Sequence, residues 1–151
     1  MKVEEKLLEL AQKEYEMRYE RMKHFDAKIN MLLVLSATLI ALSFQSFNVN
    51  ICVRILSMLC AVISIGNLIL AVIGLCIKKH KLISIEQLEN IVNSKCEYDV
   101  FIKSIIKGYG HSIASMEKIS SRKGSIIKIG CALLIIAGFL FVSKIIIMVF
   151  V

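Results

Sequence analysis

The stretch ILSMLCAVISIGNLILAVIGLCI, residues 55–77, runs for 23 positions without a charged side chain. Residues 29–47 and 126–151 form two further apolar stretches, and only the last of them contains lysines. An α-helix needs about 20 mostly apolar residues to cross the hydrocarbon core of a bilayer. The sequence therefore predicts three transmembrane helices, at 29–47, 55–77 and 126–151.

The rest of the composition favours helices over a barrel. Hydrophobic residues make up 57% of the chain, above the roughly 45–50% of soluble proteins, and there is no proline. Long alternation of apolar and polar residues, which is typical of a spanning barrel, does not occur. Backbone N–H and C=O groups in lipid must find hydrogen-bond partners within the chain. Once a barrel is excluded, α-helices are the remaining structure that can span the membrane. We therefore expect an all-α membrane protein whose three spans carry long cytoplasmic helical extensions, residues 1–28 and 78–125.

The distribution of basic residues predicts the orientation. Residues 1–28 carry seven Lys or Arg and residues 78–128 carry ten, whereas the connection between the first two spans has only Arg54. Basic residues beside spans stay in the cytoplasm, so the N-terminus is expected inside and the C-terminus outside. The formal net charge of +7 is explained in this way. We therefore expect membrane lipids, not nucleic acid, as partners.

Residues 1–28 have the pattern of an amphipathic helix. Neither Gly nor Pro interrupts the chain from Lys2 to Phe47, so this helix is expected to continue into the first span. Its apolar face either packs on the chain's own central segment or receives a partner or a second copy. The face consists of Leu8, Ala11, Tyr15, Tyr19, Met22, Phe25 and Ile29.

Two helices are expected in residues 78–125. Ser84 and Gln87 form a capping box, which predicts a helix start just after Ser84. A second helix is expected from about residue 97, with Gly108 and Gly110 each weakening it by up to ~1 kcal/mol relative to alanine. A break is therefore expected near these glycines or at residues 120–124. The apolar face of the second helix is Phe101, Ile105, Tyr109, Ile113, Met116 and Ile119.

Small and polar residues mark one face of the second span. They follow steps of three and four residues, so they allow close packing of helices or line a polar path. Asn67 is an amide in mid-span and needs partners, so we take Ser64 and Asn67 as candidate path-lining residues. The first span is also rather polar for a lipid-facing helix, which predicts burial in a bundle. The face of the second span is Ser57, Ala61, Ser64, Asn67, Ala71 and Gly74.

The third span carries Gly130, Ala137 and Lys144 at seven-residue steps, on one helix face. Lys144 therefore lies on the side of the small residues. Its ammonium either snorkels to the outer interface or contributes to the path, and we take it as the third path-lining candidate.

Motifs of catalysis and metal binding are missing from the sequence. The three histidines are scattered, the five cysteines include no C-x-x-C pair, and no nucleophile-elbow or P-loop pattern occurs. We expect no enzymatic activity, no metal and no bound cofactor. Lys103, Lys107 and His111 flank Gly108 and Gly110 and are weak candidates for nucleotide or phosphate contacts. The alternative is that the glycines only weaken a helix.

The stretch RMKHFDAKINMLL, residues 21–33, joins an amphipathic helix through an Asp-Ala-Lys triplet to a span that opens with Leu-Leu. With the three-span layout, it resembles the Pycsar transmembrane effector family of bacterial anti-phage defence. The resemblance implies a partner nucleotide cyclase, a cyclic pyrimidine mononucleotide as ligand, and impairment of the bacterial inner membrane in abortive infection. Asp26 and Lys28 would then couple the extension to the first span, or would only anchor the helix at the headgroups.

Three spans cannot enclose a pore alone, so we expect a homo-oligomer. The leading hypothesis is a signal-gated effector that forms an oligomeric pore or lesion. A SLATT-like or holin-like pore-forming protein is one alternative. A non-conducting membrane scaffold or anchor is another.

Overall fold

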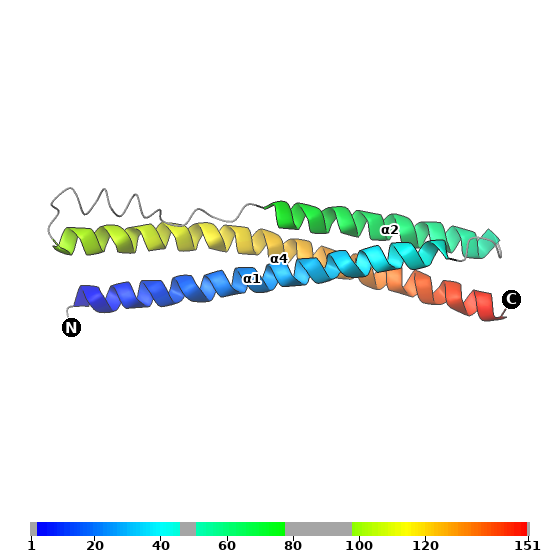
Figure 1. Cartoon of the computed structure of the whole chain (residues 1–151), viewed down its shortest axis with the longest axis horizontal. Helices are drawn as coiled ribbons and strands as arrows, with labels where there is room; N and C mark the ends of the chain where they lie inside the picture. The colour runs from blue at the N-terminus through cyan, green and yellow to red at the C-terminus, as the bar shows by residue number, and fades with distance from the viewer. Residues whose placement is uncertain (1–2, 46–50, 78–97, 151) are drawn as a thin grey trace. The chain divides into compact units, whose positions relative to one another are not determined.

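The structure is a computed structural model that describes residues 3–45, 51–77 and 98–150. It contains the helices α1 (Val3–Phe44), α2 (Ile51–Cys76) and α4 (Tyr98–Phe150), as Figure 1 shows. None of the described residues lies in a strand. Each helix includes a stretch long and apolar enough to cross a membrane. The all-helical fold with three possible spans is thereby confirmed for the described part of the chain.

Helix α1 is continuous over 42 residues, as predicted from the lack of Gly and Pro. Helix α4 is continuous over 53 residues and passes through Gly108, Gly110 and residues 120–124. The prediction of a break near the two glycines or at residues 120–124 is therefore wrong. A glycine costs a helix only about 1 kcal/mol, and packed residues on either side, such as Ile102 and Met116, hold the helix together. The predicted capping box at Ser84 lies outside the described residues.

The chain divides into two compact units. The first, here called the extension unit, comprises Met1–His24 and Lys78–Ser121, and the second, the span unit, comprises Phe25–Ile77 and Arg122–Val151. The division falls within α1 and within α4, both of which continue through it without a break.

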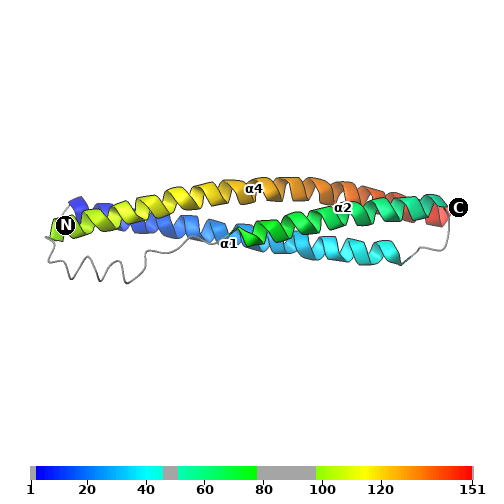
Figure 2. The same cartoon turned by 90° about the horizontal axis from the view of Figure 1, so that it is seen from above.

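Within the extension unit, α1 and α4 lie side by side and run in the same direction (Figures 1 and 2). Tyr15 contacts Tyr109, and Arg18 contacts Glu117, so residue numbers rise together along the pair. Of the two alternatives for the apolar face of the first helix, the structure shows packing on the described part of the chain's own central segment. Most of the predicted face is buried or half-buried, but Tyr19 is 37% exposed and the half-buried Arg18 lies on the packed face in its place.

Within the span unit, α2 runs antiparallel to both α1 and α4. Asn67 bonds to Ser36, whereas Gly74, further along α2, contacts the earlier residue Ile29 of α1. The first two spans are therefore antiparallel neighbours. Helices α1 and α4 run parallel to one another in this unit.

A seven-residue repeat of buried positions runs along both long helices. Such a repeat is the seam of a left-handed coiled coil, in which every second turn returns to the same neighbour. On α1 the repeat is Met22, Ile29, Ser36 and Ser43, and on α4 it is Met116, Lys123, Gly130, Ala137 and Lys144. The six predicted residues of α2 are all buried, together with Val53 and Cys60.

Candidate functional site in the span unit

The span unit has polar side chains inside and apolar side chains outside. Large hydrophobic residues such as Val62 and Phe139 are mostly exposed, as expected of surfaces that meet lipid. The interior of the unit instead contains buried hydroxyls, an amide and two ammonium groups. These buried polar residues are Ser36, Ser43, Ser57, Ser64, Asn67, Lys123 and Lys144.

Asn67 connects all three helices near the middle of the span unit. Its Nδ2 donates to Ser36 Oγ at 2.9 Å, and Ser36 Oγ donates to the carbonyl of Leu32 at 2.7 Å. Asn67 Oδ1 lies against Gly130, where an added Cβ would come within 2.9 Å of that oxygen and within 2.9 Å of Leu32 Cδ1. Gly130 therefore permits the close approach of α4. The partner that the mid-span amide needs is a hydroxyl on α1.

Two serine hydroxyls and one amide oxygen are buried without a hydrogen-bond partner among the described residues. They are Ser57 Oγ, Ser64 Oγ and Asn67 Oδ1, all on α2. A buried polar atom without a partner is costly and calls for an explanation. In this arrangement the path-lining candidates Ser64 and Asn67 face the interior of a single protomer.

Lys144 caps the end of α1. Its Nζ donates to the carbonyl of Ser43 at 3.2 Å and to that of Leu42 at 3.4 Å, just before α1 ends at Phe44. The last carbonyls of a helix have no partner within the helix and carry the negative end of its dipole. A lysine satisfies both needs. Because Lys144 is 2% exposed, its ammonium lies inside the bundle, which differs from the snorkelling alternative.

Asp26 forms an ion pair with Lys123 between α1 and α4. The Lys123 side chain is almost fully buried, and that of Asp26 is about one-fifth exposed. Asp26 was a candidate from sequence, whereas Lys123 was missed, although extending the seven-residue series of Gly130 by one step would have found it. Lys28, the other coupling candidate, is exposed.

The two buried lysines of α4 lie on the same face, three seven-residue steps apart. At 1.5 Å per residue their Cα atoms are separated by about 31 Å along the helix. The hydrocarbon core of a bilayer is about 30 Å thick. Lys123 and Lys144 are thus spaced to lie near opposite edges of the core, each bound to α1.

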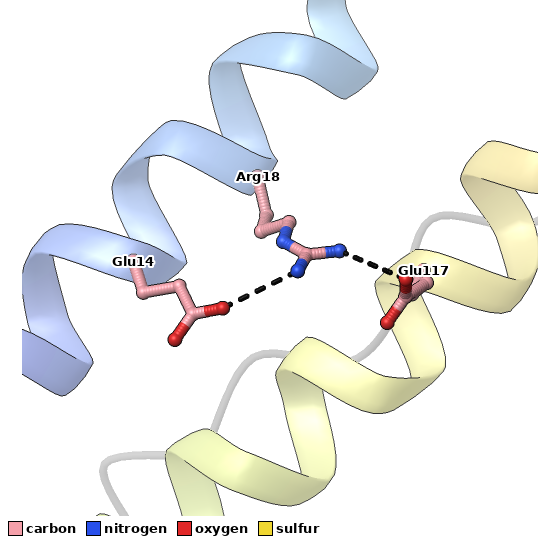
Figure 3. Close-up of polar contacts among 3 residues, drawn as sticks. All are labelled: Glu14, Arg18 and Glu117. Carbon is pink, nitrogen blue, oxygen red and sulfur yellow. Dashed lines mark hydrogen bonds and ion pairs between the residues drawn. The ribbon is translucent and has the colours of Figure 1, made fainter.

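The extension unit contains a group of three charged side chains and a group of three tyrosine rings. Arg18 reaches Glu14 Oε1 at 3.3 Å on its own helix and Glu117 Oε1 at 3.4 Å on α4 (Figure 3). The Tyr15 ring meets Tyr109 edge-on at 5.5 Å and stacks beside Tyr19 at 6.4 Å. Burial raises the pKa of Tyr15, and the neighbouring tyrosines raise it further.

The weak nucleotide candidates lie on the outer side of the same unit. Lys103, Lys107 and His111 are exposed on α4 at four-residue steps, so they share one helix face. On α1, a shallow groove includes the exposed apolar residues Leu7, Leu10 and Met17 beside basic groups. Its other lining residues are Ala11, Lys13, Glu14, Arg18 and Arg21.

No group of three His, Cys, Asp or Glu side chains among the described residues is arranged to hold a metal ion. Comparison of the chain with family models, with curated proteins and with solved structures finds no significant match.

Proposed function

We propose that this chain is a signal-gated membrane effector of bacterial anti-phage defence. In this proposal a partner cyclase makes a cyclic pyrimidine mononucleotide during infection. Homo-oligomers of the chain, in the inner membrane with the N-terminus in the cytoplasm, then form a pore or lesion that stops growth. The resemblance of residues 21–33 to the Pycsar transmembrane effectors supports the signal and the partner.

The observation that carries the membrane activity is the polar interior of the span unit. A helix that only anchors needs apolar or small residues at its packing face, because intramembrane polar groups are costly and usually functional. Here one seam contains two lysines, an amide and several hydroxyls. If the three helices separate, the amide and the hydroxyls of this interior become a polar face that neighbouring copies can enclose around water.

The unbroken helices support a mechanical route for the signal. Both α1 and α4 pass from the extension unit into the span unit without a break. Asp26 and Lys123 each come two residues after the division in their helices. In the proposed mechanism, a nucleotide held near Lys103, Lys107 and His111 shifts the extension helices, and the same helices carry the shift into the bundle.

The test is depolarisation in cells that produce the chain with a cyclase of this signalling class. Loss of membrane potential, followed with a voltage-sensitive dye, is expected only when both proteins are present. A cyclase without catalytic activity is the matched control. Unchanged potential despite correctly inserted protein would reject the function, and killing without any cyclase would favour the holin-like alternative.

A non-conducting scaffold is the second candidate, because the bonds of Asn67 and Lys144 are also those of a packed bundle. Ser64→Ala separates the two functions. The Ser64 hydroxyl has no partner among the described atoms, so its removal should leave packing intact. An altered conductance or ion preference in planar bilayers is expected of a path, whereas a scaffold shows no conductance in either form.

A further inference from the structure

We infer that Lys123 and Lys144 form a two-point lock that holds α4 to α1 and keeps the span unit in its closed, non-conducting form. The inference rests on the proposed function for the consequence of opening, but the lock itself is a property of the bundle. It gives the lysines a role opposite to that of pore-lining residues.

The inner point of the lock is the ion pair between Lys123 and Asp26. The Lys123 side chain is 2% exposed, so its ammonium has exchanged water for one carboxylate. Pulling the two helices apart would leave the Lys123 ammonium without its carboxylate at the edge of the hydrocarbon core, which is strongly unfavourable. The helices can therefore separate here only if water reaches both groups.

The outer point is the bond from Lys144 to the carbonyls of Leu42 and Ser43. The ammonium and the end of α1 satisfy one another, so separation again exposes a charge and the last carbonyls of a helix together. Between the two points the seam of α4 offers Gly130 and Ala137, which add no charge. Opening thus requires both charged contacts to be released.

The lock and the pore-lining role predict opposite changes in conduction when one of the lysines is neutralised. A lysine that lines a path should reduce conduction when it is neutralised. If the lysine instead holds the bundle closed, neutralising it should allow conduction without any signal. The structure favours the second outcome because both ammonium groups bind α1 of their own chain.

The experiment uses the full chain in vesicles of mixed neutral and anionic phospholipids with entrapped dye. Lys123→Met should raise signal-independent release by about a hundredfold or more, as expected when one partner of a buried ion pair is removed. Lys144→Met should raise it by about tenfold or more, because its ammonium makes hydrogen bonds to carbonyls and no ion pair. Lys118→Met is the matched control, because Lys118 is exposed on the same helix and lies in the extension unit, outside the stretch between the two lysines. It should change release by less than about twofold.

Two further variants distinguish the lock from misfolding. Lys144→Arg keeps donors for the carbonyls, and the exchange Asp26→Lys with Lys123→Asp restores the inner pair with reversed charges. Both should return release to near the wild-type rate. If the wild-type chain releases dye on signal, neutral variants that release dye without signal at the wild-type rate or more slowly overturn the lock.

A second readout does not depend on leakage. Amine-reactive labelling followed by mass spectrometry should modify Lys123 and Lys144 at least about tenfold more slowly than the exposed Lys118. Asp26→Asn should accelerate labelling of both buried lysines, since the two points open together. Protected lysines with no leakage in any variant would support the lock and reject the membrane-lesion function. Unprotected lysines in a protein that leaks on signal would overturn the lock and leave that function standing.

Discussion

The extension unit and the span unit share the seven-residue repeat of packed positions, but the polarity of their packed and exposed side chains is opposite. In the extension unit the packed positions are mainly apolar or aromatic, such as Tyr15, Met22 and Met116, and charged side chains such as Glu20 and Lys23 are exposed. In the span unit the packed positions include lysines, serines and an amide, and the exposed positions are Ile, Val, Leu and Phe. The same seven-residue repeat thus serves two solvents, because water favours charges outside and lipid excludes them.

The ion pairs of the two units differ in the same way. Arg18 and Glu117 remain in contact with solvent, whereas Lys123 and Asp26 are mostly shielded from it. An exposed pair is screened and contributes little, but removal of one partner from a buried pair leaves an uncompensated charge. The following substitutions should sharpen or break this contrast.

The largest effect is expected from Asp26→Asn. It leaves the Lys123 ammonium buried without its carboxylate and should lower the free energy of unfolding by about 3–5 kcal/mol. Unfolding in mixed detergent micelles, followed by circular dichroism, measures the change. Replacing both partners, Asp26→Leu with Lys123→Met, should be close to neutral. A double variant as unstable as the single one would show that the charge is not the cause.

A smaller effect is expected from Gly130→Leu, because any Cβ at this position comes within 2.9 Å of Asn67 and Leu32. Overpacking of this kind costs about 1–3 kcal/mol. Gly138→Leu is the matched control on the same helix, since a Cβ there meets nothing within 4 Å. Equal losses of stability in the same micelle assay would contradict the close approach at Gly130.

Replacement of Tyr15 by leucine should weaken the extension unit by about 0.5–1.5 kcal/mol through loss of its ring contacts with Tyr109 and Tyr19. The ring contacts also have a pH signature. Burial raises the pKa of Tyr15 above its usual 10.0, so the neutral form is favoured in the folded state. Its contribution is complete below pH 10 and is lost as pH rises through the raised pKa. Tyr15→Phe should reduce this alkaline loss of helicity.

The smallest effect is expected from Glu117→Gln. Glu117 is two-thirds exposed, so loss of its contact with Arg18 should cost less than about 1 kcal/mol and should vanish at high salt. Stability measured at low and at high ionic strength checks both points. A loss comparable to that of Asp26→Asn would remove the contrast between the two units.

Periodicity in the sequence was sufficient to predict much of the candidate site. Six of the eight buried residues of α2 were predicted, Ser64 and Asn67 among them, whereas Val53 and Cys60 were not. The shared face of Gly130, Ala137 and Lys144 was predicted as well. Each of these is a property of one helix, and the spacing of residues along one helix is visible in the sequence. The partners were not predictable in the same way. Lys123 with Asp26 and Lys144 with Ser43 join residues about 100 positions apart.

The sequence by itself determined that three apolar helices form, where their small and polar faces lie, and that α1 needs no break. These follow from side-chain chemistry and local spacing alone. Only the tertiary structure decided that α4 continues through its glycines, that Lys144 ends on the carbonyls of α1, and that Asp26 pairs with Lys123. The physical reason is that these outcomes depend on the register between helices, and register is settled by the packing of all three helices together.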